Sequence, residues 1–222
     1  MQLFLVRHGE SANNATAESL RVHDPGLTEV GHQQATLLGA WFSSVNPDVL
    51  VTSPFRRALL TTVPIQRSTG LNPLVWRDLH EQGGCVSGYP EMGYQGEPGL
   101  SAAEICEEFP GCEPEREIGA QGWWRQQPYE TDRAVDARVE RVVVRTLKTY
   151  GTTDLKVVFV MHADFKRALL RGFCTDHSFR LDDYGPLFNA GVTILNISGS
   201  SVCLDIYNGV QHLPYDLVTP SF

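Results

Sequence analysis

Two histidines, His8 and His162, each come directly after a continuous run of apolar residues. Such runs are typical of strands that are buried on both faces of a parallel sheet. Open α/β sheets place their ligands beyond the carboxyl ends of the strands. We therefore expect both imidazoles at one edge of the sheet, facing the same crevice.

Two arginines and a glutamate are expected at this edge as well. Arg56 and Arg57 open a predicted helix after the apolar run 49–51, and Glu81 follows the short apolar run 74–76. A guanidinium group is always charged and forked, which suits it to clamp a phosphoryl dianion. The combination favours phosphoryl transfer.

The residue types assign a role to each group in such a reaction. His8 can attack phosphorus directly and hold the group as phosphohistidine. Arg7 and Arg57 would lower the pKa of His8, which keeps its attacking nitrogen free near neutral pH. His162 and the arginines would bind the equatorial oxygens, where transition-state charge spreads. Glu81 would protonate the leaving oxygen and then activate water.

The same segments resemble, in order, the motifs of the histidine phosphatase superfamily, in the branch that contains cofactor-dependent phosphoglycerate mutases. Residues 7–14 match Arg-His-Gly-Glu-(Ser/Thr)-x-x-Asn, and residues 53–61 resemble Ser-x-Leu-x-Arg-Ala-x-x-Thr, which selects Arg57 over Arg56. Residues 79–81 resemble the family's Leu-x-Glu acid, and residues 160–168 resemble its Val-x-His-Gly-x-x-x-Arg segment. Residues 189–193 resemble the segment whose Asn opens the family's penultimate strand.

The resemblance implies a phosphoglycerate mutase-like fold and hydrolysis of small phosphate monoesters through a phosphohistidine on His8, with neither a metal nor a cofactor. The implied catalytic residues are His8, Glu81, His162, Arg7 and Arg57, and the implied substrate-binding residues are Arg7, Asn14, Arg57, His162 and Ala163.

Two departures from the family's pattern keep alternatives open. Mutases follow the glutamate with Arg-x-Tyr-Gly, whereas residues 82–85 are Gln-Gly-Gly-Cys. Ala163 stands where the family has glycine, and its methyl group would narrow the pocket. A phosphoglycerate mutase is the alternative enzyme, and a non-catalytic protein that binds phosphorylated ligands is the alternative from another class.

The alternation of strands and helices predicts an α/β fold, a three-layer α/β/α sandwich with a mainly parallel central sheet. We expect one domain over residues 1–222, with an insertion or lid at about 82–129 whose part 82–99 is a long loop. Thr28 and Ser53 are predicted helix N-caps. Pro64 is predicted to kink or stop its helix.

Composition limits the partners. The formal net charge of -8 argues against nucleic-acid and anionic-membrane surfaces, which recruit basic faces. No apolar run is long enough for a membrane helix, and no signal peptide is recognisable. The five cysteines show no Cys-x-x-Cys pair, so we expect reduced thiols, no zinc site and a cytoplasmic protein. The expected partner is a small phosphorylated substrate, and a homodimer remains an option.

Overall fold

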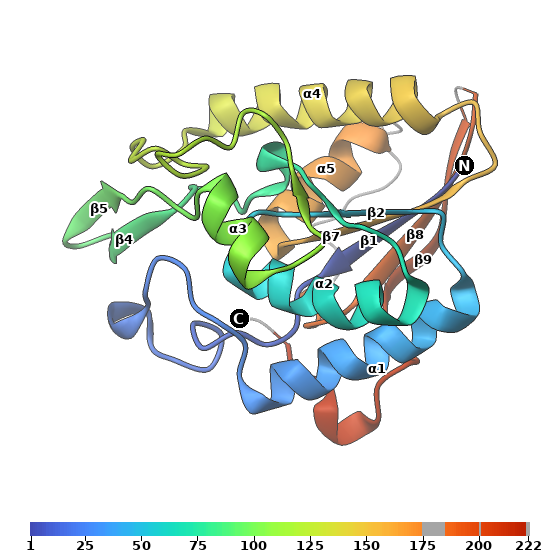
Figure 1. The fold of residues 1–222 in the computed structure, drawn as a ribbon, viewed down its shortest axis with the longest axis horizontal. Helices are drawn as coiled ribbons and strands as arrows, with labels where there is room; N and C mark the ends of the chain where they lie inside the picture. The colour runs from blue at the N-terminus through green and yellow to red at the C-terminus, as the bar shows by residue number, and fades with distance from the viewer. Residues whose placement is uncertain (175–184, 200, 221–222) are drawn as a thin grey trace.

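A seven-stranded sheet, in the order β6-β3-β2-β7-β1-β8-β9, forms the centre of the computed structural model (Figure 1). The structure describes residues 1–174, 185–199 and 201–220. The strands of this sheet are β1 (Gln2–Arg7), β2 (Val49–Thr52), β3 (Leu74–Val75), β6 (Glu113–Pro114), β7 (Lys156–Met161), β8 (Val192–Ser198) and β9 (Ser201–Gly209).

The order and direction of the strands bring the two histidines together. β1 pairs with β7 in parallel, and Arg7 lies opposite Met161 at the end of the pair. His8 and His162 therefore leave the sheet at the same edge. Strands β2, β3 and β6 continue the parallel part of the sheet on the far side of β7. On the other side, β8 pairs antiparallel with β1, and β9 pairs antiparallel with β8. The predicted α/β fold with a mainly parallel sheet is confirmed.

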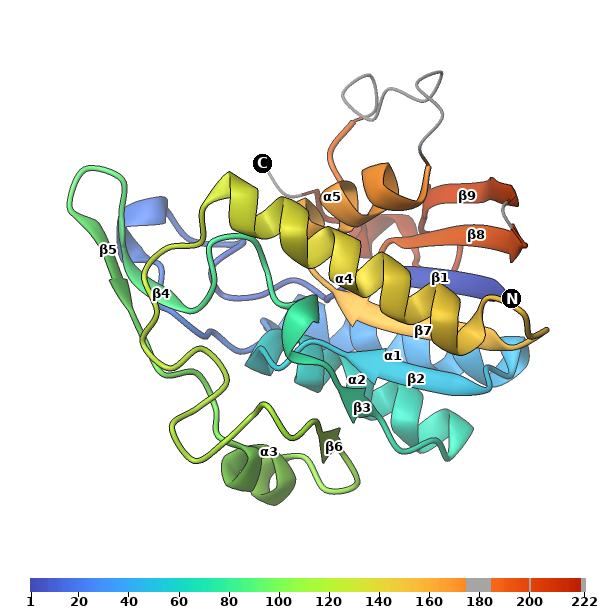
Figure 2. The same cartoon turned by 90° about the horizontal axis from the view of Figure 1, so that it is seen from above.

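Helices cover both faces of the sheet (Figure 2). Helices α1 (Glu29–Val45) and α2 (Arg56–Thr69) lie on one face, and α4 (Asp132–Tyr150) and α5 (Ala163–Phe173) on the other. Successive residues of β1 point to opposite faces of the sheet. Phe4 packs in the core beneath α1 and α2, and Leu5 packs in the core beneath α4 and α5. Because both faces are buried, the strand carries an unbroken apolar run. No helix in the described ranges is both long and apolar enough to cross a membrane.

Three residues were predicted to start or interrupt helices: Thr28, Ser53 and Pro64. Thr28 Oγ1 caps α1 by accepting the N–H of Gly31 at 3.0 Å. The prediction for Ser53 is wrong, since α2 begins at Arg56 and the Ser53 hydroxyl lies 2.7 Å from His162 Nε2. Pro64 does not stop α2, which runs through it to Thr69, so that part of the prediction is wrong. Close packing of Pro64 against α1 outweighs the local cost of proline.

The segment 82–129 contains a hairpin, a helix and a strand. The hairpin β4 (Val86–Tyr89) and β5 (Gly93–Gly96) lies in the part 82–99 predicted as a long loop, and helix α3 (Ala102–Glu108) and strand β6 follow it. The hairpin has glycine-rich strands that bury little, so no apolar period reveals it. The rest is integrated into the fold: β6 extends the central sheet, and buried side chains from this segment share a core with α2.

Candidate active site

His8 stands at the end of β1 with a defined hydrogen-bond partner on each ring nitrogen. Its Nδ1 lies 2.6 Å from the carbonyl oxygen of Gly9, and its Nε2 lies 3.1 Å from the Nε–H of Arg57. Since a carbonyl can only accept and a guanidinium can only donate, these partners assign the proton to Nδ1 and a lone pair to Nε2. Nε2 is therefore the ring nitrogen that carries the unprotonated lone pair.

The surroundings of His8 keep it neutral. Burial, followed by the charges of Arg57 and Arg7, lowers the pKa of His8 well below its usual range. Only 3 % of the residue is exposed, so solvent screens these charges little. The imidazole is thus unprotonated at neutral pH, as the nucleophilic role requires.

The turn after His8 is fixed by close backbone packing. Gly9 donates its N–H to Thr61 Oγ1 at 3.0 Å, and a Cβ on Gly9 would lie 2.7 Å from the carbonyl oxygen of Gly31. Only glycine allows this approach of the two backbones. Thr61 is the threonine that ends the motif at residues 53–61, and its place in α2 ties that helix to the His8 turn.

The two neighbouring arginines of α2 have different surroundings. Arg57 reaches His8, whereas Arg56 turns away and forms an ion pair with Glu108 of α3. The structure therefore places Arg57 in the site and Arg56 outside it, as the sequence motif indicates. Arg7 is 1 % exposed, lines the same cavity as Arg57 and donates to the carbonyl of Leu187.

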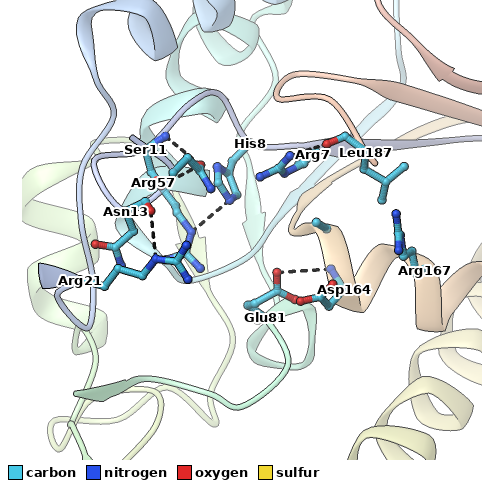
Figure 3. Close-up of a pocket in the computed structure, with 12 residues that line it drawn as sticks. Arg7, His8, Ser11, Asn13, Arg21, Arg57, Glu81, Asp164, Arg167 and Leu187 are labelled. Atoms are coloured by element: carbon cyan, nitrogen blue, oxygen red, sulfur yellow. Dashed lines mark hydrogen bonds between the residues drawn. The ribbon is translucent and has the colours of Figure 1, made fainter. Parts of the chain in front are cut away.

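Glu81 faces His8 across the cavity and is held by backbone donors (Figure 3). Its Oε1 accepts the N–H groups of Gln82 and Phe165, both at 2.9 Å. Burial and the nearby charge of Asp164 raise the pKa of Glu81 above its ordinary value. A raised pKa keeps a larger fraction of this carboxyl protonated, which suits a general acid.

A buried arginine supports the segment that carries Glu81. Arg138 of α4 donates to the carbonyls of Asp78 at 3.0 Å and His80 at 2.8 Å, and it pairs with Glu130. Its guanidinium also lies 3.8 Å from the ring centroid of Phe165. Arg138 therefore supports both the backbone before Glu81 and Phe165, whose N–H binds the Glu81 carboxylate. No sequence motif indicated this role of Arg138.

His162 lies behind His8, with its ring centroid 5.1 Å from that of His8. The residue is fully buried, and its Nε2 shares a hydrogen bond of 2.7 Å with Ser53 Oγ. Burial and the charge of Arg57 lower its pKa well below the usual range. Within the described structure it does not line the cavity, and its Nδ1 is buried without a hydrogen-bond partner.

The other predicted binding residues reach the cavity. Ala163 lines it at the start of α5. Asn14 also lines it, and its Oδ1 accepts from the N–H of Ser11 at 3.0 Å and the Ser11 hydroxyl at 2.9 Å. These contacts orient the Asn14 amide.

The cavity measures about 380 Å³, enough for a small phosphorylated metabolite. Its complete lining is Arg7, His8, Ser11, Asn13, Asn14, Arg21, Arg57, Glu81, Ala163, Asp164, Arg167 and Leu187. Arg21 and Asp164 were not predicted, because Arg21 lies outside the recognised motifs and Asp164 occupies an unspecified position of the segment 160–168. Nowhere in the described ranges does a group of three or more His, Cys, Asp or Glu residues form a metal-ion site.

One further buried charge lies beneath the site. Lys166 of α5 is fully buried, and its Nζ donates to the carbonyl of Gly191 at 2.9 Å. Burial, followed by the charge of Arg7, lowers its pKa well below the usual range of lysine.

Comparison with known proteins agrees with this geometry. A family model described as "Histidine phosphatase superfamily (branch 1)" matches residues 3–208. A solved structure of mycobacterial glucosyl-3-phosphoglycerate phosphatase shares 25% identity at a TM-score of 0.65, and the alignment covers 94% of this chain and 99% of that one. A phosphoserine phosphatase structure from Entamoeba histolytica, at 20% identity and a TM-score of 0.62 over 96% and 99% of the two chains, shows the same fold.

Curated relatives match over a shorter stretch. Phosphoserine phosphatase 1 of Hydrogenobacter thermophilus is 38% identical over 71 residues, which are 32% of this chain and 34% of that protein. A 2,3-bisphosphoglycerate-dependent phosphoglycerate mutase of Chelativorans sp. is 39% identical over 74 residues, 32% of this chain and 36% of the mutase. These alignments span about a third of each relative.

Proposed function

The chain belongs to the histidine phosphatase superfamily, branch 1, and from that premise we propose that it hydrolyses small phosphate monoesters through a phosphohistidine intermediate. The observation that carries the proposal is the state of His8. Its Nε2 is unprotonated, accepts a hydrogen bond from Arg57, faces a cavity with several guanidinium groups and lies opposite Glu81.

In the first step, His8 Nε2 attacks phosphorus, and the P–N bond forms as the bond from phosphorus to the ester oxygen breaks. Arg57 and Arg7 hold the phosphoryl oxygens and stabilise the charge on them. Arg57 Nε, which now donates to His8, is released to the substrate as the imidazole lone pair is used. Glu81 gives its proton to the departing alcohol oxygen, which leaves Glu81 ionised and the alcohol neutral.

In the second step, a water molecule attacks the phosphohistidine from the side of Glu81. The ionised carboxylate takes a proton from this water as the new P–O bond forms and the P–N bond breaks. Inorganic phosphate leaves, His8 Nε2 recovers its lone pair, and Glu81 is protonated again. Asn14 and His162 are the further groups we propose for phosphate binding.

Phosphate release tests the proposal. The wild type should release inorganic phosphate from an aryl phosphate and from several metabolite phosphates, with a chelator present. His8→Ala should lose this turnover. Equal phosphate release by wild type and His8→Ala would overturn the covalent mechanism.

Phosphoglycerate mutase activity is the second candidate, because curated relatives with that name match part of the chain. It would require transfer of the phosphoryl group from the enzyme to a hydroxyl oxygen of phosphoglycerate, on the carbon that did not carry the first phosphate. Gln82 and Gly84 stand where the mutases carry the Arg and Tyr of their Arg-x-Tyr-Gly motif, and neither lines the cavity of the described structure. Exclusive transfer after priming with bisphosphoglycerate, without phosphate release, would favour the mutase.

We propose a reducing compartment, the cytoplasm, as the place of action. All five cysteines are free in the structure, and burial raises the pKa of Cys85 and of Cys112 to about 12. Thiols with such pKa values are poor nucleophiles, so these two residues act as packing side chains.

A further inference from the structure

Helix α2, which carries Arg57, receives its N-terminal cap from a different part of the chain. Its own N-cap residue is Phe55, whose side chain makes no capping hydrogen bond. The first N–H groups of a helix have no acceptor within the helix, so they need one from elsewhere. Asp24 supplies it, because its Oδ1 accepts the backbone N–H of Arg56, the first residue of α2, at 2.9 Å. A carboxylate at this position also interacts favourably with the helix dipole.

The loop that carries Asp24 is anchored on both sides of it. On one side, the Asn13 side chain donates to the carbonyl of Val22 at 2.7 Å and accepts the N–H of Val22 at 3.0 Å. On the other side, the carbonyl of Gly26 accepts the N–H of Ala12 at 3.1 Å. Both anchors belong to the segment that follows β1. The loop therefore connects the chain just after the nucleophile to the start of the helix that carries the arginine.

The carboxylate of Asp24 also acts on the guanidinium of Arg57. Burial lowers the pKa of Arg57, and the charge of Asp24 is the largest cause that opposes this. Burial raises the pKa of Asp24 to about 6, and the charge of Arg57 is the largest opposing cause. The Arg57 guanidinium is thus attracted by Asp24 while its Nε–H donates to His8 Nε2 at 3.1 Å (Figure 3).

Three other titratable residues belong to the surroundings of Asp24. The charges of Arg56 and His23 lower its pKa further. The thiol of Cys85 lies 3.9 Å from the carbonyl oxygen of His23, and burial followed by the charge of Asp24 raises its pKa to about 12. Cys85 therefore stays neutral, and His23 is the neighbour whose own titration needs a control.

We propose that Asp24, in its ionised form, is a positioning residue that holds the start of α2 and the Arg57 guanidinium at His8 Nε2. The inference rests on the proposed function and adds a residue outside the motifs recognised in the sequence. Asp24 does not line the cavity of the described structure, so it acts through Arg57 and not on the substrate. A displacement of about 1 Å in such a group can cost about 100-fold in rate.

Two substitutions separate the charge of Asp24 from its hydrogen bond. Asp24→Asn keeps an oxygen for the Arg56 N–H but has no charge, and Asp24→Ala has neither. We expect kcat/KM for an aryl phosphate at about pH 8 to fall by about tenfold in Asp24→Asn and by about 100-fold in Asp24→Ala. Glu29→Gln is the control, because it removes an exposed carboxylate from the first turn of α1 and should keep the wild-type value.

The pH dependence tests whether the ionised form is the one that acts. Asn resembles protonated Asp, so the ratio of wild-type to Asp24→Asn kcat/KM should fall toward one as the pH drops through the Asp24 pKa of about 6. The ratio cancels the ionisation of the substrate and of the groups that both proteins share. His23→Gln should retain the wild-type acid limb. A ratio that is the same at every pH would mean that the side chain only fills space, and it would overturn the proposal.

The nitrogen-15 NMR signal of His8 Nε2 tests the same link without turnover. At about pH 8 the ring is neutral, and Nε2 is an acceptor whose signal reports whether a donor is bonded to it. Arg57→Gln provides the signal without the Arg57 donor. We expect Asp24→Ala to move the wild-type signal toward that reference and Glu29→Gln to leave it in place. If Asp24→Ala does not fold, Asp24→Asn should show a smaller movement in the same direction. A wild-type signal in the folded Asp24 variants would overturn the positioning role.

Failure of the positioning role is distinct from failure of the proposed function. If the wild type releases phosphate and Asp24→Asn matches it at every pH, only the role of Asp24 is wrong. If the wild type releases phosphate from no ester, the phosphatase proposal falls, and the His8 signal still decides whether Asp24 holds Arg57 at His8.

Discussion

Arg57 and His8 are joined by a hydrogen bond in which the guanidinium Nε–H donates to the imidazole Nε2 at 3.1 Å. The contact links the first turn of α2 to the end of β1, two segments that are far apart in sequence. It marks Nε2 as the unprotonated nitrogen, and it places a permanent charge beside that nitrogen. Several properties of the site follow from this pair.

Arg57→Gln should raise the pKa of His8. The charge of Arg57 is the second cause of the lowered value, after burial. Its loss should move the pKa of His8 upward, while burial keeps it below its ordinary value. An NMR titration of the imidazole C–H signals measures this shift. Arg56→Gln is the matched control, because Arg56 pairs with Glu108 at the surface and should leave the titration unchanged.

Glu81→Gln should affect poor leaving groups much more than good ones. An alkyl alcohol needs a proton as it departs, whereas a nitrophenolate leaves without one. We expect kcat/KM for alkyl phosphates to fall by about 100-fold or more and that for nitrophenyl phosphate by far less. An equal loss on both substrates would remove Glu81 as the general acid.

Asp164→Asn should shift the alkaline limb of the pH profile. The negative charge of Asp164 contributes to the raised pKa of Glu81, and its removal lowers that pKa. Since Glu81 must be protonated to act as an acid, activity should then decline at lower pH than in the wild type. Asp136→Asn on α4 serves as the control. An alkaline limb that does not move in Asp164→Asn would mean that Asp164 does not tune the acid.

Lys166→Met should stabilise the protein at neutral pH. The pKa of Lys166 lies well below 10.5 in the folded state, so the unfolded chain binds the extra proton between the two values. The free energy of unfolding therefore contains a penalty at neutral pH that fades as the pH rises toward 10.5. The methionine variant should gain about 1–3 kcal/mol at pH 7 and lose this pH dependence. The carbonyl of Gly191 keeps the backbone N–H of Arg7 as a donor.

Chemical denaturation across pH 7–10 measures the effect of Lys166→Met. Lys148→Met, at an exposed position in the last turn of α4, should change the unfolding free energy little. A destabilised Lys166→Met variant would show that the buried amine contributes more through its hydrogen bond than it costs by burial.

Arg138→Gln and Arg141→Gln should differ sharply in stability. Both arginines project from α4 toward the segment before Glu81, but the Arg138 side chain is 1% exposed and that of Arg141 is 58% exposed. Breaking the buried Arg138–Glu130 pair should cost about 3–5 kcal/mol, whereas the exposed pair is worth less than about 1 kcal/mol. Thermal unfolding compares the two, and similar losses would contradict a buttressing role for Arg138.

Much of the fold could be predicted from the chain itself. The unbroken apolar runs of β1 and β7 predict buried parallel strands, and their shared direction predicts that His8 and His162 meet. The hairpin β4–β5 could not be predicted, because its glycine-rich strands bury too little to leave a pattern. The helix start at Ser53 was misread because its hydroxyl is used by His162, a tertiary contact that local signals do not contain.

Site residues that stand in sequence motifs could be predicted. Residues that reach the site from an irregular loop or through tertiary packing could not. Arg57 was separated from Arg56 by the motif, and the structure gives the two these different surroundings. Arg21 stands in an irregular loop that hydrogen bonds from Asn13 hold in place. Arg138 lies on α4, where the sequence shows only the pattern of an ordinary amphipathic helix. Such residues are recognised only after the tertiary contacts are known.

The phosphohistidine itself is the most direct test of the account. We would mix the wild type with a labelled phosphate monoester, quench within a turnover and map the acid-labile, alkali-stable label by peptide mass spectrometry. We expect the label on the peptide that contains His8 and no label on the His8→Ala variant. A label on another residue, or full turnover by His8→Ala, would contradict it.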